Sequence, residues 1–326
     1  MPKLRPFTLS PVLVEKPWGG RRLADYGKPL PEGVMIGESW EIEDLPGAIV
    51  PHIEDPQSRV ASGPLAGCSL RSVIDQAGEE LLGPVMPTSE GRFPLLVKLL
   101  DARENLSVQV HPPEAYVDLH PEARLKTESW YVIGGDPGSQ LFLGFKEDTD
   151  LNAAKRTIGS SALVPQLRTV DALPGGFHHV PAGLVHSIGA GVMLAEVQVP
   201  SDTTFRLYDW ADEYNRTPRQ MHFDEGAASI LLHPQDALSE PPVSESGVRD
   251  LTVNQHYWMR EHRHATSQIE LSSQPGPRVI MVISGRVSVG DVSLGVGSTA
   301  IVPAVAIAED VVVARSAVFL EIGLTV

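Results

Sequence analysis

The chain has only one cysteine, Cys68, among its 326 residues, and it has no long apolar run. One cysteine cannot form an internal disulfide, which is typical of proteins in a reducing cytosol. No apolar run approaches the roughly 20 residues that a membrane-spanning helix needs. The first residues, MPKLRPFTLSP, lack the apolar stretch of a signal peptide. These absences predict a cytoplasmic protein without a membrane partner.

Positive charge is also scarce. Lysine and arginine number 26 against 41 aspartates and glutamates, so the formal net charge is −15. An acidic surface repels the phosphates of nucleic acids and of anionic membranes, so we expect neither as a partner. An anionic small substrate is compatible with this charge only if a local basic pocket receives it.

The 29 glycines and 28 prolines are spread along the chain, which indicates turns between many short elements. Apolar patterns predict strands at residues 5–15, 37–43, 95–100, 108–111, 128–133, 177–180, 184–188, 191–199 and 203–209, and short strands over 278–326. The segment KPWGG at residues 16–20 is expected to break the first strand. Helices are predicted at 69–82, with Ser69 as N-cap, at 148–162 and at 219–232.

Many short strands punctuated by glycine favour antiparallel barrels or sandwiches, so the predicted fold is mainly β. Residues 236–247, which contain Pro241 and Pro242, are the best candidate for a linker. We therefore predict two β-barrels in tandem. The larger domain covers residues 1–240, with a few helices inserted in and flanking its barrel, and the smaller one covers residues 241–326.

A set of metal-ligating side chains lies on the predicted strands of the larger domain. Gln109 and His111 are two residues apart, so both side chains leave the same face of a strand. Glu128 begins a second strand, and His186 follows a tight turn at Gly183. Imidazole, carboxylate and amide oxygen suit a borderline divalent cation. With one coordination position left open, such a set is typical of a catalytic metal site.

Four further polar residues are predicted to face the same interior. Lys98 interrupts the apolar run at 95–100, where a charge is costly unless it points into a polar cavity. Lys126 lies two residues before Glu128, so the two share a strand face. Ser107 lies two residues before Gln109 and shares its face. Arg206 follows Thr204 by two residues on a later strand.

Gly175, Pro181, Gly183 and His186 match the second motif of the cupin superfamily, although Ala190 stands where asparagine is usual and Gln109 replaces the first histidine of the usual pair. These departures resemble one subfamily, the short bacterial form of the type I mannose-6-phosphate isomerases. The stretches that carry the resemblance are KPWGG (16–20), GESWE (37–41), PLLVKLLDARENLSVQVHP (94–112), KTESWYV (126–132), VPAGLVHSIG (180–189) and EVQVPSDTTFRLYDW (196–210).

The resemblance implies tandem cupin-like, jelly-roll barrels, of which the C-terminal one holds no metal. It also implies one zinc ion per chain, held by Gln109, His111, Glu128 and His186. The implied reaction interconverts mannose 6-phosphate and fructose 6-phosphate through a cis-enediol. The small-molecule partner is thus a hexose phosphate, and the protein is expected to be a monomer or a small homo-oligomer.

Roles for the other residues follow from the same resemblance. Arg206, Lys126 and Glu196 are the expected catalytic residues, while Lys98, Ser107, Lys126 and Arg206 are expected to bind substrate. The general base is left open between Glu196 and Asp202, and the cation that binds the phosphate is also left open. Two alternatives remain: a cupin oxygenase that uses ferrous iron, and a non-catalytic sugar-binding or regulatory cupin.

Overall fold

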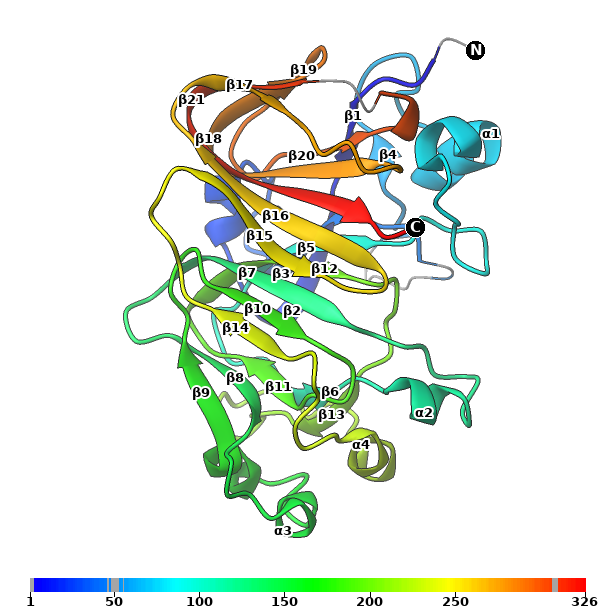
Figure 1. Cartoon of the computed structure of the whole chain (residues 1–326). Coiled ribbons are helices and arrows are strands. Elements are labelled where there is room, and N and C mark those ends of the chain that lie inside the picture. Colours follow the sequence, from blue (N-terminus) through cyan, green and yellow to red (C-terminus); the bar gives the residue numbers. More distant parts are fainter. Residues whose placement is uncertain (1–2, 46, 48–52, 55, 307–309) are drawn as a thin grey trace.

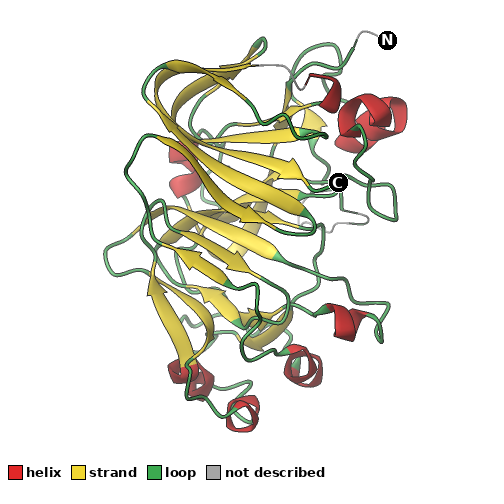
Figure 2. Ribbon diagram, viewed as in Figure 1, coloured by secondary structure: helices red, strands yellow, loops and turns green. Residues whose placement is uncertain are grey.

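The computed structural model describes residues 3–45, 47, 53–54, 56–306 and 310–326. Its strands form three antiparallel sheets, which Figures 1 and 2 show as successive layers of the molecule. The prediction of a mainly β fold is therefore confirmed. Among the described residues, no helix has the length and apolar character needed to cross a membrane.

The central sheet has seven strands. In spatial order they are β14 (Leu238–Glu240), β10 (Phe177–Val180), β7 (Glu128–Gly135), β12 (Val192–Gln198), β5 (Leu96–Asp101), β3 (Ile36–Ile42) and β2 (Val12–Gly20). A five-stranded sheet covers one of its faces, in the order β13 (Phe205–Tyr208), β6 (Val108–Val110), β11 (His186–Ile188), β8 (Gln140–Phe145) and β9 (Leu167–Asp171).

A nine-stranded sheet covers the other face and contains the C-terminal part of the chain. Its main path is β15 (Gly247–Val253), β16 (Tyr257–His264), β21 (Asp310–Leu324), β18 (Arg278–Val289), β20 (Thr299–Val302), β1 (Phe7–Ser10) and β4 (Arg59–Val60). Two short strands, β17 (Ser267–Glu270) and β19 (Val292–Leu294), pair with β21 and β18.

Helices are few and lie outside the sheets (Figure 2). They are α1 (Leu70–Leu82), α2 (Glu114–Val117), α3 (Leu151–Lys155) and α4 (Phe223–Ser229), with 3-10 turns at Arg22–Tyr26, Ser161–Gln166 and Ala304–Ala306. Helix α1 confirms the prediction for residues 69–82. The Ser69 hydroxyl caps it by accepting a hydrogen bond from the Ser72 amide at 3.2 Å.

Alternation along the central strands sorts their side chains between two interiors. Leu99, Tyr131 and Ala195 pack in one core with residues of the nine-stranded sheet such as Met281 and Leu320. Their neighbours Leu100, Trp130 and Leu194 pack in a second core with Leu141 and Ile188 of the five-stranded sheet. Because Lys98, Glu128 and Glu196 lie on the same alternate positions as this second set, they also face the five-stranded sheet.

Three predicted elements are corrected. Residues 5–15 form two strands, and β2 continues through KPWGG to Gly20 instead of breaking there. The glycines of that motif permit close strand contact: a Cβ on Gly19 would lie 2.5 Å from the Gly37 amide nitrogen. The predicted helix 148–162 stops at Lys155, and a separate 3-10 turn capped by Ser160 follows.

The third correction concerns residues 219–232, where only Phe223–Ser229 is helical. The preceding residues form a loop instead, because the Asp209 carboxylate accepts hydrogen bonds from both the backbone and the side chain of Arg219. This loop matters for the site, as described below.

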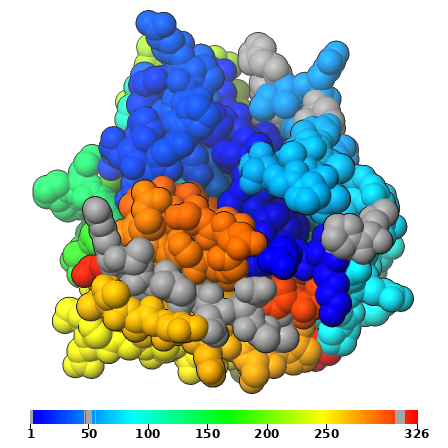
Figure 3. Space-filling view, turned by 90° about the horizontal axis from the view of Figure 1, so that it is seen from above, coloured from blue at the N-terminus to red at the C-terminus, as the bar shows by residue number. Residues whose placement is uncertain are grey.

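The division into domains at residues 240 and 241 stays a prediction. Strand β14 ends at Glu240 in the central sheet, and β15 begins at Gly247 in the nine-stranded sheet. However, β1 from the N-terminal end pairs with β20, with Phe7 opposite Ile301. Figure 3 shows the blue N-terminal segment against the orange C-terminal segment on this face. The first strand therefore ties the larger predicted domain to the smaller one.

Candidate metal centre and substrate cavity

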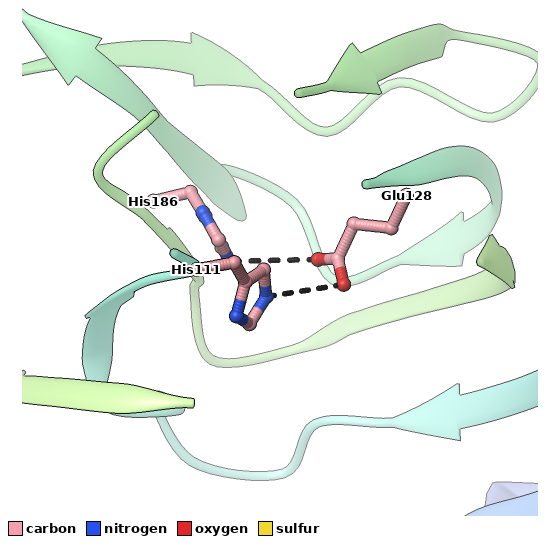
Figure 4. A group of neighbouring side chains, drawn as sticks. All are labelled: His111, Glu128 and His186. Atoms are coloured by element: carbon pink, nitrogen blue, oxygen red, sulfur yellow. Dashed lines mark ion pairs between the residues drawn. The ribbon is translucent and has the colours of Figure 1, made fainter. Parts of the chain in front are cut away.

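His111, Glu128 and His186 meet between the central and five-stranded sheets (Figure 4). The Nε2 atom of His111 lies 3.2 Å from Oε2 of Glu128, and Nε2 of His186 lies 3.4 Å from Oε1 of the same carboxylate. Each residue is at most 1% exposed. The sequence assigned all three to one site, and the structure brings them together.

Strand pairing and one tight turn place these ligands. Gln109 of β6 pairs with His186 of β11, and His111 follows directly after β6. The turn before β11 has Gly183 in the left-handed region, at φ 87°, and the Gly183 amide donates to the His111 carbonyl at 2.8 Å. Glu128 comes from the opposite side, at the start of β7.

Backbone carbonyls fix the orientation of both imidazole rings. Nδ1 of His186 donates to the Leu184 oxygen at 2.8 Å, and Nδ1 of His111 donates to the Thr203 oxygen at 3.2 Å. Since a carbonyl can only accept, each proton resides on Nδ1 and each Nε2 presents a lone pair. Burial, followed by the Lys126 ammonium, lowers the pKa of His111 to about 3, and burial also lowers the pKa of His186. Both rings are therefore neutral at pH 7.

The carboxylate facing them is also an acceptor. Burial raises the pKa of Glu128, but Lys126 and the two histidines outweigh burial and hold that pKa well below its usual range. Both oxygens of Glu128 and both Nε2 atoms are buried without a hydrogen-bond partner among the described residues. Lone pairs that converge in this way are unfavourable unless a cation lies among them, so the residues fit a divalent metal ion.

Gln109 is beside this cluster and also lines a cavity of about 270 Å³ that opens next to it. Its strand neighbours are His186 on one side and Arg206 on the other. Among the described residues, the Gln109 amide makes no hydrogen bond to the three ligands, so its role as a fourth ligand stays a prediction.

The cavity is rich in charge. Its walls include the cations Lys16, Lys98, Lys126, Arg206 and Arg219 and the carboxylates Glu38, Glu196 and Asp202. Ser107 lines it as well. All of the residues expected to bind substrate or catalyse the reaction therefore face one space.

Lys98 is held deep in this cavity by acceptors. Its Nζ donates to Glu196 and to Gln198, both at 2.9 Å, and lies 3.7 Å from Oε2 of Glu38. The register aligns these groups, because Glu196 is directly opposite Lys98 on the neighbouring strand. The carboxylates outweigh burial and raise the pKa of Lys98, so it stays charged but has its acceptors within the protein.

Glu196 is a buried member of the same network. Its two oxygens accept hydrogen bonds from Lys98 and, at 3.2 Å, from the indole nitrogen of Trp130. Burial, with Glu128 nearby, raises its pKa despite the opposing Lys98 charge. A carboxylate whose pKa is raised and that faces a cavity is suited to proton transfer.

Two other cations occupy different positions. Lys126 lies next to the metal candidate, with Nζ 3.3 Å from Oε2 of Glu128. The side chain of Arg206 is more exposed than that of Lys126, and its Nη1 donates to the Gln220 carbonyl at 2.6 Å. Burial, followed by Arg219, lowers the pKa of Arg206 to about 10.

Sequence reasoning did not single out Lys16, Glu38 or Arg219. Lys16 and Glu38 belong to the motifs KPWGG and GESWE, so these motifs could have identified them as candidate site residues. Arg219 had no such signal, because it was placed at the start of a predicted helix.

Antiparallel sheets that enclose a His-Glu-His cluster beside a charged cavity define a cupin-type protein with a candidate metal centre. Comparisons with known proteins then identify the family. Residues 7–128 match the family model for the catalytic domain of type I phosphomannose isomerase. The chain is 36% identical over 253 residues to the probable mannose-6-phosphate isomerase GmuF of Bacillus subtilis, a match that covers 76% of this chain and 75% of that protein.

Two more comparisons agree. The putative mannose-6-phosphate isomerase YvyI of the same bacterium is 33% identical over 288 residues, which cover 86% of each protein. The crystal structure of mannose 6-phosphate isomerase from Bacillus subtilis superimposes with a TM-score of 0.82 at 27% identity, covering 98% of this chain and 99% of that one. The chain belongs to the type I mannose-6-phosphate isomerase family.

Proposed function

We propose that this protein is a zinc-dependent aldose–ketose isomerase that interconverts mannose 6-phosphate and fructose 6-phosphate. The observation that carries the proposal is the cluster of converging lone pairs from His111, Glu128 and His186. It lies next to a cavity lined by cations, among them Lys126, whose Nζ is 3.3 Å from Oε2 of Glu128. Membership of the family supplies the substrate pair.

Zinc is the metal we propose, with one ion per chain. Two imidazoles and a carboxylate are ligands that zinc prefers, and Gln109 is the proposed fourth. A mannose 6-phosphate isomerase solved in a zinc-bound form shares the fold, with a TM-score of 0.74 at 17% identity over 99% of this chain and all of that one. When bound, the ion would act as a Lewis acid that polarises the sugar oxygens at C1 and C2.

The residues of the chain would carry the remaining steps. Isomerisation moves a proton between C1 and C2 through a cis-enediol, so one group must remove and return that proton. We assign this role to Glu196, which is buried at the cavity wall, and keep Asp202 at the cavity as the rival. Lys98 would hold the Glu196 carboxylate in place through its 2.9 Å hydrogen bond.

Stabilisation of negative charge on oxygen is the other requirement. Lys126 is placed beside the metal candidate and would donate to the oxygen that gains charge. Arg206 would orient the sugar from the other side, and the Ser107 hydroxyl would hydrogen-bond to it. Because these donors are held before substrate arrives, they need little reorganisation during the reaction.

A coupled isomerase assay tests the proposal. Purified protein should convert both hexose phosphates, a chelator should abolish the activity, and zinc should restore it. Element analysis should find about one zinc per chain, whereas iron would favour the oxygenase alternative. Metal-loaded protein that binds hexose phosphate but converts neither one between pH 6 and 9 would point to the sugar-binding or regulatory alternative.

The ligand assignment has its own test. His186→Ala should lose both metal and activity, because one of two buried imidazole ligands is removed. His233→Ala is the matched control, since His233 is an exposed histidine outside the cluster. Retention of the full metal content by His186→Ala would refute the ligand set.

A further inference from the structure

Gln198 ends strand β12 and is completely buried beside the site. Its exposed fraction is 0%, and it lies directly opposite Glu128 on the neighbouring strand β7. Because it comes two residues after Glu196, its side chain leaves the same face of the strand. Gln198 does not itself line the cavity. Its side chain is therefore placed behind the cavity wall, in contact with groups that form the wall.

Three partners use the carboxamide group of Gln198. Its Oε1 accepts from Nζ of Lys98 at 2.9 Å, and its Nε2 donates to the carbonyls of Val199 at 3.0 Å and of Ser201 at 2.9 Å. An ammonium group can only donate and a carbonyl can only accept, so a single orientation of the amide satisfies all three partners. A carboxylate has no N–H group for the carbonyls, and an aliphatic side chain meets none of the three.

The turn after β12 carries two groups to the site. Asp202 lines the cavity, and the Thr203 carbonyl accepts from Nδ1 of His111 at 3.2 Å. The Thr203 amide in turn donates to the Ser201 hydroxyl at 3.2 Å. Since Gln198 also holds the Ser201 carbonyl, it fixes the first part of the turn that orients His111.

On its other side, Gln198 contacts the partner of the candidate base. Nζ of Lys98 donates to Gln198 and to Glu196 at the same distance, 2.9 Å. Two acceptors on one strand hold the ammonium group between them, and loss of either lets it turn toward the other. A chain of hydrogen bonds through Gln198 therefore joins the candidate base to the ring of His111.

We propose that Gln198 is a positioning residue that couples the two halves of the site: it holds Lys98 against Glu196, and it holds the turn whose Thr203 carbonyl orients His111. It acts through these groups and not on the substrate. Loss of a partner that orients a metal-ligating imidazole typically costs about 10- to 100-fold in metal affinity or activity. Gln198 is one hydrogen bond further from the ring, so we expect the lower end of that range.

The proposal rests on the proposed function and is tested with Gln198→Met, which removes all three hydrogen bonds at similar volume. Zinc affinity, measured by competition with a chelator, should weaken about 10-fold, and kcat at saturating zinc should fall about 10-fold. KM for mannose 6-phosphate should change much less, because Gln198 does not line the cavity. A merely structural role would lower the midpoint of urea unfolding but leave the zinc affinity and kcat of the folded protein unchanged, and that result would overturn the proposal.

Gln166→Met is the matched control. The same substitution there removes a carboxamide whose Nε2 donates to the Thr157 hydroxyl at 3.0 Å and to the Ala162 carbonyl at 2.9 Å, and Gln166 does not line the cavity. It should keep the zinc affinity and kcat of the wild type. Equal changes in the two variants would contradict a specific role of Gln198, and so would a loss of zinc affinity alone or of kcat alone, since one side chain serves both halves.

If Gln198→Met does not fold, Gln198→Asn takes its place. It keeps the carboxamide, but its side chain is one methylene shorter and cannot reach Lys98 and the Ser201 carbonyl at once. It should show the same two losses, and wild-type zinc affinity and kcat in this variant would overturn the proposal.

The zinc competition separates this proposal from the proposed function, because it needs no turnover. Zinc affinity that is weakened in Gln198→Met but normal in Gln166→Met would support the hold on His111 even if the wild type isomerised nothing. Wild-type protein that isomerises both sugars, with a Gln198→Met variant that matches it in zinc affinity and kcat, would overturn the positioning role and leave the function standing.

Discussion

Replacing Lys98 with methionine should strongly destabilise the protein. The side chain of Lys98 is 9% exposed and that of Glu196 is 6% exposed, so solvent screens their ion pair only weakly. Methionine fills a similar volume but donates no hydrogen bond. The variant therefore leaves Glu196 and the side-chain oxygen Oε1 of Gln198 without their Lys98 donor and removes one cation from beside Glu38.

The size of the effect follows from the uncompensated charge. Removal of one partner from a buried ion pair typically costs about 3–5 kcal/mol. Glu38 contributes less, because burial raises its pKa but Lys16, Lys98 and Trp40 together lower it to about 2, and two of those three remain in the variant. A loss of about 3–5 kcal/mol corresponds to a fall in Tm of roughly 4–7 °C for a chain of this size.

Urea unfolding of wild type, Lys98→Met, Glu196→Gln and the double variant measures this effect as a thermodynamic cycle. The double variant should regain more than half of the loss, since neither charge of the pair remains. The cost should also be smaller at pH 5 than at pH 8. Without Lys98, the folded-state pKa of Glu196, which burial already raises in the wild type, would rise further. The variant is therefore most stable at low pH and loses stability as pH rises through that folded pKa.

A loss below about 1 kcal/mol in Lys98→Met would refute this reasoning. It would mean that the ion pair is not formed in solution, and Lys98 would then be available to bind substrate directly. The same variant should lose isomerase activity in either case, so stability and not activity is the deciding measurement.

Three further predictions test other contacts. Gly20→Ala should cost about 1–3 kcal/mol of stability, because its Cβ would lie 2.3 Å from Oδ2 of Asp101, whereas Gly295→Ala, with no atom within 4 Å, should be nearly neutral in the same thermal melts. Tyr257→Phe should cost about 1–2 kcal/mol in urea unfolding, since its hydroxyl donates to the Val197 carbonyl at 3.1 Å, and no measurable loss would show that bond to be unimportant. Lys126→Met should keep its metal by element analysis but lose roughly 100-fold or more in kcat, and normal turnover would exclude Lys126 from catalysis.

Much of the site could be predicted because it depends on local pattern. Residues two apart on a strand share a face, which placed Lys126 with Glu128 and Ser107 with Gln109 before the fold was known. The turn at Gly183 fixed the position of His186 in the same way. Helix α1 was equally accessible, because its N-cap and apolar stripe lie within one short segment.

The remaining contacts of the site depend on residues that are far apart in the sequence. The sequence indicates that Lys98 faces a cavity, but Glu196 is 98 residues away, and only the register of β5 against β12 brings the two together. That pairing changes the expectation for Lys98 from a free cation that binds substrate to a partner of the candidate base.

The prediction of a helix over residues 219–232 was wrong for a related reason. Its apolar pattern is genuine from Phe223 onward, but Asp209 captures the Arg219 backbone and side chain before the helix can begin.

The pairing of Lys98 with Glu196 and the capture of Arg219 by Asp209 have one physical origin. A buried lysine must find carboxylates, and in doing so it ceases to be available to an anionic ligand, so the cations that look most functional in a buried strand are the least free. Arg206 of strand β13 and Arg219 of the loop after it are less constrained, because the two share one carboxylate, Asp209. Lys98 is therefore less available to an anionic ligand than Arg206 or Arg219. The stability of Lys98→Met, and not its activity, should for this reason reveal whether Lys98 is paired in the folded protein.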